Sequence, residues 1–261
     1  MTLPTPSKEL GQHFLVDDNI LGVIGRLAEL GPADVVLEVG PGPGALTSYL
    51  ADRVAAVHAV ELDRRLEPHL RARLGDRPNV HLRFEDAVSL DADALEPVPT
   101  KLVSNLPYNV ATPIVVESLE RLPTLALWTV MVQREVADRF FAVPRTKAYG
   151  AVSVLLQLAT ERTGFHAVSR TVFRPPPNVD SALVSFRRRQ ERPRVPWPEL
   201  KRIVEGGFAH RRKRLPNSLE LAGITTRHEA AAALEQLGRP PSSRAEELAP
   251  EEFVRFAAAL A

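Results

Sequence analysis

The fold of this 261-residue chain is decided by the segment Val35-Val36-Leu37-Glu38-Val39-Gly40-Pro41-Gly42-Pro43-Gly44. Its first five residues have the composition of a buried strand, and residues 45–53, which follow the glycines, have that of a helix. Three glycines between a strand and a helix allow the backbone to pass close to a ligand at the helix N-terminus. The segment therefore predicts the first strand–loop–helix unit of a ligand-binding α/β domain.

Strands and helices alternate on both sides of this segment. A helix is predicted from Asn19 to Leu30, with Asp18 as its cap, because apolar residues recur there at helical spacing. Further strands are predicted at 54–60, 80–84, 101–104, 127–132 and 182–186, with helices ending near 73 and spanning about 113–120, 133–141 and 150–160. This alternation predicts a mostly parallel sheet with helices on both faces.

Acidic side chains stand at the carboxyl ends of the predicted strands, the edge where ligands bind in such sheets. Glu61 ends the second strand, 21 residues after Gly40, where a carboxylate can accept from both hydroxyls of a ribose. Asp86 follows the third strand and is placed to accept from an adenine amine. Pro41 and Pro43 lack N–H donors that a pyrophosphate would need. S-adenosylmethionine is therefore a better candidate ligand than a nicotinamide dinucleotide.

The segment Asn105-Leu106-Pro107-Tyr108 follows the fourth strand and is the most specific feature. An aromatic amine is a poor nucleophile because its lone pair is delocalised into the ring. An asparagine side-chain carbonyl and a backbone carbonyl beside a proline can accept both amine hydrogens, which makes the nitrogen more nucleophilic as charge develops. Tyr108 could stack on the base, and no strong general base is required. The alternative is an ordinary proline turn, which the position opposite the glycine loop makes less attractive.

Charge is unevenly distributed along the chain. Residues 187–214 include eleven Lys or Arg and three acidic residues, a net charge of +8, so the rest carries −7 within a total of +1. Clustered positive charge is typical of a polyanion-binding surface, although a solvated helix face is the alternative. Residues 189–198 are rich in Arg and Pro and suit a linker, and residues 199–261 show helical periodicity without a strand.

Several classes of site are excluded by composition. The chain has no cysteine, which rules out disulfides, thiolate metal sites and cysteine nucleophiles. No spacing of His, Asp and Glu is typical of a metal site, so no metal is expected. No apolar run reaches membrane-spanning length, and the first residues, MTLPTPSKELGQHF, lack a secretory pattern. We therefore expect a cytoplasmic protein without a membrane partner.

Together the motifs resemble the KsgA family, the ribosomal RNA small-subunit adenine dimethyltransferases, over nearly the whole chain. The resemblance is carried by LGQHFL (10–15), EVGPGPGALT (38–47), VELD (60–63), EDA (85–87), NLPYNVATP (105–113), KAYG (147–150), FRPPPNVDS (173–181), RRK (211–213) and NSL (217–219). The later motifs distinguish this family from DNA methyltransferases with a similar Asn-Pro-Tyr site.

The resemblance implies an α/β fold: a Rossmann-like class I methyltransferase sheet in a catalytic domain of residues 1–190, and a small all-helical, RNA-contacting C-terminal domain of residues 191–261. It implies S-adenosylmethionine-dependent dimethylation of the exocyclic N6 amine of two adjacent adenines in the 3′-terminal hairpin of 16S rRNA, with S-adenosylhomocysteine as product. The partner would be small-subunit rRNA or a pre-small ribosomal subunit during ribosome biogenesis. We expect a monomer.

The resemblance also implies roles for individual residues. The expected cofactor site comprises Gln12, His13, Leu15, Gly40, Gly42, Glu61, Leu62, Asp86, Ala87 and Asn105. The expected catalytic residues are Asn105, Leu106 and Tyr108 around the target amine, with Phe173 stacking on the far face of the base. RNA contacts are expected from Arg187, Arg211, Arg212, Lys213 and Arg214.

Two of these assignments have a structural alternative. The family usually has Asn where this chain has His13, and both side chains can hydrogen-bond through nitrogen. We therefore expect retained cofactor binding with some pH sensitivity, a neutral packed histidine being the alternative. An aromatic residue before three prolines, such as Phe173, commonly packs a loop instead of stacking on a base.

Three other functions compete with the main interpretation. A related resistance methyltransferase modifies large-subunit rRNA, but the KAYG and FRPPPNVDS segments favour the small subunit. A non-catalytic ribosome-assembly or RNA-binding factor would not require both an intact cofactor loop and an intact NLPY segment. A nicotinamide-dependent oxidoreductase is a remote third option.

Overall fold

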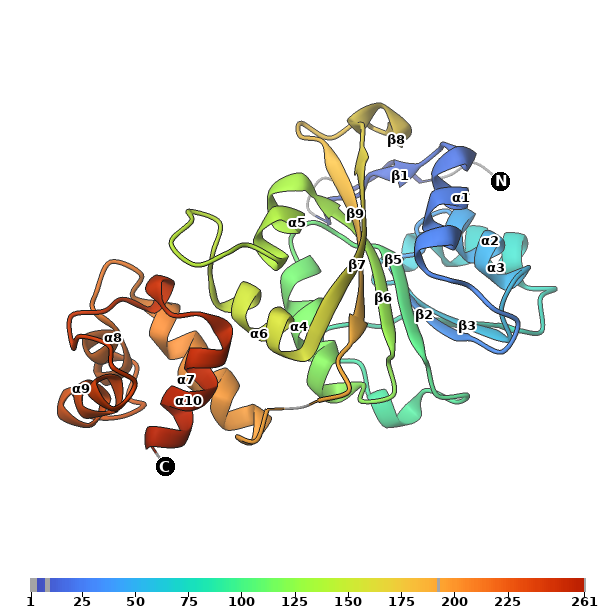
Figure 1. Ribbon diagram of the computed structural model, residues 1–261. Coiled ribbons are helices and arrows are strands. Elements are labelled where there is room, and N and C mark those ends of the chain that lie inside the picture. The colour runs from blue at the N-terminus through green and yellow to red at the C-terminus, as the bar shows by residue number, and fades with distance from the viewer. Residues whose placement is uncertain (1–3, 8–9, 192, 261) are drawn as a thin grey trace. The chain divides into compact units, whose positions relative to one another are not determined.

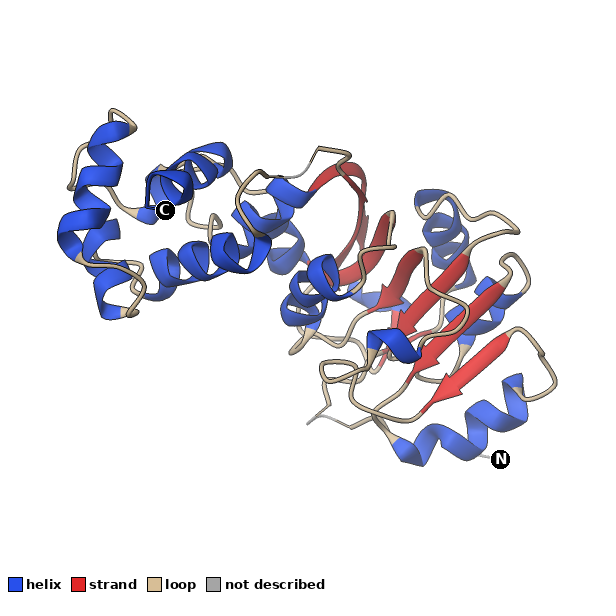
Figure 2. Cartoon of the chain, turned by 90° about the horizontal axis from the view of Figure 1, so that it is seen from below, coloured by secondary structure: helices blue, strands red, loops and turns tan. Residues whose placement is uncertain are grey.

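A seven-stranded sheet dominates the computed structural model, which describes residues 4–7, 10–191 and 193–260. In sheet order the strands are β4 (Val80–Arg83), β3 (Ala56–Val60), β2 (Val35–Val39), β5 (Lys101–Asn105), β6 (Leu127–Gln133), β9 (Ser181–Arg188) and β7 (Thr160–Val168). The first five are mutually parallel, and β9 runs antiparallel to β6. Figure 2 shows the arrowheads of the parallel strands at one edge of the sheet. The strand order reverses beside β2, which is where sheets of this type bind ligands.

Helices cover both faces of the sheet (Figure 1). On one face α1 (Asp18–Leu27) and α2 (Ala45–Ala51) pack their buried side chains, among them Ile24 and Leu50, on Val36 and Val57 of the sheet. On the other face lies α4 (Ala111–Arg121), whose Ser118 Oγ accepts from the Trp128 indole N–H at 2.8 Å. Because both faces are covered, all five residues of β2 are buried, as the apolar run predicted.

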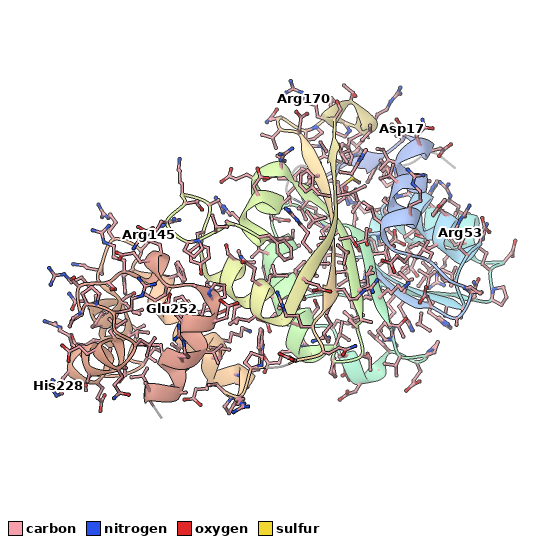
Figure 3. All side chains as sticks on the ribbon, in the orientation of Figure 1. Asp17, Arg53, Arg145, Arg170, His228 and Glu252 are labelled. Carbon is pink, nitrogen blue, oxygen red and sulfur yellow. The ribbon has the colours of Figure 1, made fainter. Side chains whose placement is uncertain are left out.

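The remaining elements of this part of the chain are shorter. They are α3 (Glu67–Leu74), α5 (Arg134–Phe140) and the 3₁₀ turns η1 (Arg64–Leu66), η2 (Ala92–Ala94) and η3 (Arg170–Val172). The α1 cap is one residue earlier than predicted: the Asp17 side chain, labelled in Figure 3, accepts from the Asn19 N–H at 2.8 Å.

Three strands of the fold were not predicted from the sequence. β1 (Phe14–Leu15) and β8 (Phe173–Arg174) form a small antiparallel sheet, which joins the N-terminal motif to the FRPPP segment. The third is β7, which lies at the edge of the seven-stranded sheet opposite to β4, and most of its residues are exposed. Its sequence, TERTGFHAV, therefore lacks the alternating or continuous apolar pattern by which strands are recognised.

The chain divides into two compact units. The first unit comprises Met1–Ala137 and Arg162–Arg188, and the second comprises Asp138–Glu161 and Arg189–Ala261. The second unit holds α6 (Ala151–Ala159), α7 (Trp197–Ala209), α8 (Leu215–Leu221), α9 (Arg227–Gln236), the turn η4 (Ala245–Glu247) and α10 (Pro250–Leu260). This division differs from the expected boundary at 190/191 because residues 138–161 pack with the C-terminal helices. The buried Tyr149 hydroxyl, for example, donates to the Leu248 carbonyl at 2.8 Å.

No helix in the described part of the chain combines the length and the apolar character needed to cross a membrane.

Candidate functional site

One pocket in the first unit lies at the carboxyl ends of the parallel strands. It holds about 1140 Å³ of space between atoms, part of it open to solvent. Its lining includes every residue expected in the cofactor site: Gln12, His13, Leu15, Gly40, Gly42, Glu61, Leu62, Asp86, Ala87 and Asn105. Leu106 and Tyr108 line it as well. The structure thus brings the expected cofactor and target-amine residues into a single cavity.

Two of the three glycines in the loop of this pocket lie against neighbouring pocket segments. Gly40 has φ 73°, and a Cβ there would lie 3.3 Å from Pro107 Cδ. Gly42 has φ 56°, and its Cβ would lie 3.3 Å from a ring carbon of Phe14. Side chains at these positions would be both strained and crowded. The glycines therefore allow the loop to approach the NLPY segment and the N-terminal motif.

Glu61 is held rigidly at the end of β3. Its two carboxylate oxygens accept from the Gly42 N–H at 3.1 Å and the Asp63 N–H at 2.9 Å. Burial raises the pKa of Glu61 above its ordinary value, and these hydrogen bonds oppose the shift. Each oxygen keeps a further lone pair, so the carboxylate can still accept from a ligand.

Asp63 connects the end of β3 to the N-terminal motif. Its carboxylate is bound by the Arg65 guanidinium and accepts from Gln12 Nε2 at 2.9 Å. The Arg65 hydrogen bonds hold the pKa of Asp63 down to about 2. Gln12 thus lines the pocket while its side chain fastens the N-terminal segment to β3. Sequence reasoning gave Asp63 no role of its own.

The loop after β4 presents Asp86, whose Oδ1 accepts from the Val88 N–H at 2.9 Å. Arg121, the last residue of α4, donates to the Val88 carbonyl at 2.9 Å and also to the Leu90 carbonyl. This arginine therefore holds the loop in place through two main-chain carbonyls. Nothing in its sequence context pointed to that contact.

Glu38 is a second polar residue that the sequence analysis left unassigned. It is 1% exposed at the end of β2, and its Oε2 has no hydrogen-bond partner among the described residues. Burial raises the pKa of Glu38 to about 8, and the neighbouring Glu61 adds to the shift. The sequence offered a signal for Glu38, because it is the one charged residue in the otherwise apolar run 35–39 and lies two residues before Gly40.

Asn105 lies at the end of β5 with its amide oriented by one clear partner. Its Nδ2 donates to the His13 carbonyl at 3.3 Å. A carbonyl can only accept, so this contact leaves Oδ1 of Asn105 as the acceptor available to the pocket. The next peptide is also fixed, since the Leu106 N–H donates to the Met131 carbonyl at 3.1 Å.

Tyr108 and His13 form a stacked pair, with ring centroids 5.5 Å apart and an interplanar angle of 28°. The Tyr108 hydroxyl shares a hydrogen bond of 2.7 Å with Ser181 Oγ, and His13 Nδ1 lies 2.7 Å from the Pro175 carbonyl, to which it must donate. Burial raises the pKa of Tyr108, so its phenol is neutral at physiological pH. These contacts tie the NLPY segment, the N-terminal motif and the FRPPP loop together.

Phe173 does not line the pocket. Its side chain is 1% exposed and packs in the core with Leu15, Met131 and Leu183. The expectation that its ring stacks on a target base is therefore not met in this structure. The loop-packing alternative describes its position, because pairing of β8 with β1 turns the ring inward.

The expected RNA-contacting residues fall into two groups. Arg187 belongs to the first unit, where its guanidinium pairs with both carboxylate oxygens of Glu29 at 2.6–2.7 Å. Arg211, Arg212, Lys213 and Arg214 belong to the second unit, between α7 and α8, and all are exposed. Arg211 alone among these four forms an ion pair within the described residues, with Glu246.

Comparison with known proteins identifies the family. The model of the ribosomal RNA adenine dimethylase family matches residues 5–261. The chain is 47% identical to the ribosomal RNA small subunit methyltransferase A of Rubrobacter xylanophilus over 251 residues, 96% of this chain and 94% of that protein.

Two solved structures are similar to the whole chain. A dimethyladenosine transferase from Plasmodium falciparum has a TM-score of 0.79 at 22% identity, covering 94% of this chain and 96% of that one, which supports the fold. The 23S rRNA methyltransferase ErmE has a TM-score of 0.66 at 32% identity, covering 95% of this chain and 99% of that one. The expected class I methyltransferase fold is thereby confirmed. On the strength of the family model and the relative in Rubrobacter, the chain belongs to the ribosomal RNA adenine dimethylase family.

Proposed function

We propose that this protein dimethylates the exocyclic N6 amine of two adjacent adenines in the 3′-terminal hairpin of small-subunit rRNA, with S-adenosylmethionine as methyl donor. The observation that carries the proposal is the position of Asn105 and Leu106. They line the same pocket as the glycine loop and the acidic side chains at the strand ends. One cavity can therefore take both a nucleoside cofactor and a target base.

The chemistry of the pocket fits S-adenosylmethionine. Glu61 offers oxygen acceptors to a ribose. Asp86 accepts from the Val88 N–H through Oδ1 and offers its other carboxylate oxygen to an adenine amine. Glu38 is a buried carboxyl with an unpaired oxygen, which suits a cationic ligand. When bound, the cofactor supplies an electrophilic methyl group on a sulfonium. Gln12, His13, Leu15, Gly40, Gly42, Leu62 and Ala87 complete the proposed cofactor site, and no metal is invoked.

In the proposed mechanism the protein activates the target amine by accepting hydrogen bonds from its two N–H groups. Oδ1 of Asn105 and the main-chain carbonyl of Leu106 accept from the target amine, which makes its nitrogen more nucleophilic as positive charge develops. The neutral ring of Tyr108, already supported by His13, presents a face on which the flipped base can stack. Taking the base out of its helix costs a few kcal/mol of free energy, and stacking on the Tyr108 ring offsets part of this cost.

The small ribosomal subunit is the preferred substrate over the large one. The relative with 47% identity is named for the small subunit, whereas ErmE, named for 23S rRNA, is 32% identical. A non-catalytic assembly factor is disfavoured because the pocket keeps both the glycine loop and the acceptors at Asn105 and Leu106. We further propose that the protein acts in the cytoplasm as a monomer, with Arg187 and the basic residues of the second unit contacting RNA.

The deciding experiment is methyl transfer to small ribosomal subunits that lack the modification, with large subunits as the control. Mass spectrometry of the digested rRNA is expected to show N6,N6-dimethyladenosine at two adjacent positions in the 3′-terminal hairpin of the small-subunit rRNA. Methylation of the large subunit alone, or of neither subunit, would defeat the proposal.

A further inference from the structure

The loop of residues 86–90 presents Asp86 to the pocket at the strand ends. Most of the hydrogen bonds described for this loop are local. The Val88 N–H donates to Asp86 Oδ1 at 2.9 Å, and the Ser89 N–H donates to the Asp86 carbonyl at 3.1 Å. Because these bonds are internal, they shape the loop without fixing its position on the sheet.

Arg121 attaches the loop to a helix of the first unit. It is the last residue of α4, and its Nη1 donates to the Val88 carbonyl at 2.9 Å. Its Nη2 donates to the Leu90 carbonyl. The two nitrogens belong to one planar guanidinium, so they fix both the distance and the orientation of the loop relative to α4.

A second cavity of the first unit separates the loop from α4. It holds about 430 Å³ of space between atoms, part of it open to solvent. Its lining comes from the loop, including Val88 and Leu90, from strands β2 and β5, and from α4, including Arg121. Space in place of packed side chains provides few van der Waals contacts. The position of the loop therefore depends on the arginine.

The end of α4 that carries Arg121 is itself fixed. Arg188 in β9 donates to the Leu119 and Leu122 carbonyls at 3.0 Å each. The other end of α4 begins shortly after the NLPY segment, residues 105–108 (Figure 1). One anchored helix therefore connects the proposed acceptors for the target amine with the loop that carries the proposed acceptor for the cofactor.

We infer that Arg121 is a positioning residue for the cofactor, which fixes the loop of residues 86–90 so that Asp86 meets the adenine amine. The inference rests on the proposed function, which assigns the second carboxylate oxygen of Asp86 to that amine. A hydrogen bond weakens steeply as its geometry departs from the ideal, so a small displacement of the loop weakens this contact. Glu61, the proposed ribose acceptor, is held by main-chain N–H groups of other segments. Loss of Arg121 should therefore impair recognition of the adenine and spare that of the ribose.

The inference is tested with Arg121→Met in the full-length protein, because methionine keeps a long aliphatic side chain and removes both donors. Calorimetry measures affinity for S-adenosylhomocysteine and for its deamino analogue, in which hydrogen replaces the exocyclic amine of the adenine. Affinity for S-adenosylhomocysteine is expected to fall about tenfold, as for a lost hydrogen bond to a charged group, and affinity for the deamino analogue to stay within about twofold of wild type.

The matched control is Arg53→Met, which removes another arginine of the first unit that donates to a main-chain carbonyl. Arg53, labelled in Figure 3, donates to the Tyr49 carbonyl at 2.8 Å and does not contact the loop of residues 86–90. Both affinities should remain at their wild-type values in this control. A loss in Arg53→Met equal to that in Arg121→Met would overturn the inference.

The remaining outcomes separate the inference from the proposed function. If the wild-type protein binds S-adenosylhomocysteine and Arg121→Met binds it equally well, the positioning role is wrong and the proposed function stands. Equal losses for the two ligands in Arg121→Met would also overturn the positioning role, because the effect would not pass through the adenine amine. If the wild-type protein binds neither ligand, the proposed function itself fails.

Comparison with Arg121→Lys separates positioning from an effect of charge. Lysine keeps the charge but cannot reproduce the planar fork that reaches both carbonyls. Positioning predicts that lysine recovers only part of the affinity, and that both variants lose hydrogen-exchange protection at the Val88 and Ser89 amides while the rest of the first unit keeps its protection. A long-range effect of charge predicts full recovery by lysine with unchanged protection, and that result would overturn the inference.

Discussion

The pocket at the strand ends and the basic turn of residues 211–214 use polar groups in opposite ways. In the pocket, carboxylates and carbonyls are buried or fixed by main-chain hydrogen bonds, as Glu61 is by Gly42 and Asp63. In the basic turn, the exposed Arg212, Lys213 and Arg214 have no ion-pair partner among the described residues, whereas Arg211 is held by Glu246 and the Lys147 carbonyl. The contrast indicates that the two regions have different functions. The pocket is organised for chemistry on one base, and the basic turn for sequence-independent binding of RNA phosphates.

The variant Asn105→Ala is expected to separate the two functions most clearly, because it should lower the rate of methyl transfer without weakening RNA binding. Removing the acceptor that acts as charge develops should lower the rate of methyl transfer by about 10²–10³-fold. Affinity for RNA should remain close to wild type, because Asn105 is a pocket residue and not one of the RNA-contacting cations. Transfer is measured at saturating cofactor, because Asn105 also lines the expected cofactor site. Single-turnover transfer and equilibrium binding check both parts. If weaker RNA binding accounted for the whole loss of rate, the claim that Asn105 acts only in the pocket would be contradicted.

Glu61→Gln should weaken cofactor binding and leave RNA binding intact. The amide has one acceptor oxygen, so either the Gly42 N–H or the Asp63 N–H loses its partner, and the ribose loses a charged acceptor. Hydrogen bonds to charged groups contribute about 1.5–3 kcal/mol, which corresponds to a loss of roughly tenfold to hundredfold in affinity. Calorimetric titration with S-adenosylmethionine measures this, and wild-type affinity would remove Glu61 from the site.

The converse experiment is Arg212→Gln/Lys213→Gln/Arg214→Gln. The loss of three cations should make the salt dependence of RNA binding shallower by about 2–3 in slope. At saturating RNA the rate of methyl transfer should be unchanged, since the pocket keeps its residues. If the rate of methyl transfer at saturating RNA falls instead, the basic turn contributes to catalysis, which contradicts the proposed separation of functions.

Glu38→Gln should change the pH dependence of stability. In the unfolded chain a glutamate has a pKa near 4.5, whereas burial raises the pKa of Glu38 to about 8. Between these values the native state binds more protons, so the free energy of unfolding decreases as pH rises, by at most about 1.4 kcal/mol per pH unit. The variant should flatten this decrease in denaturant titrations of the ligand-free protein. An identical pH dependence in variant and wild type would contradict the assignment.

The same contrast explains which features the sequence could predict. The pocket residues occupy the ends of successive strands in a parallel sheet, so apolar runs followed by Gly40, Glu61, Asp86 and Asn105 predict that they meet. Strand β2 was predicted with its observed bounds, because a strand buried on both faces is a continuous apolar run.

Features that depend on tertiary contacts were not predictable in this way. The contacts of Arg211 with Thr146 and Lys147 join segments about 65 residues apart, and no local pattern records them. Phe173 turned into the core because β8 pairs with β1 across most of the first unit's sequence. Strand β7 lacked an apolar pattern because it is exposed at the edge of the sheet.

The central claim is that Asn105 Oδ1 and the Leu106 main-chain carbonyl accept hydrogen bonds from the N6 amine of a flipped adenine beside the cofactor. A structure of the protein with S-adenosylhomocysteine and an RNA that carries the target hairpin tests it directly. The account predicts the adenine amine within hydrogen-bonding distance of Asn105 Oδ1 and the Leu106 carbonyl, with the base against Tyr108. An adenine held elsewhere, with the Asn105 side chain turned away from its amine, would contradict the account.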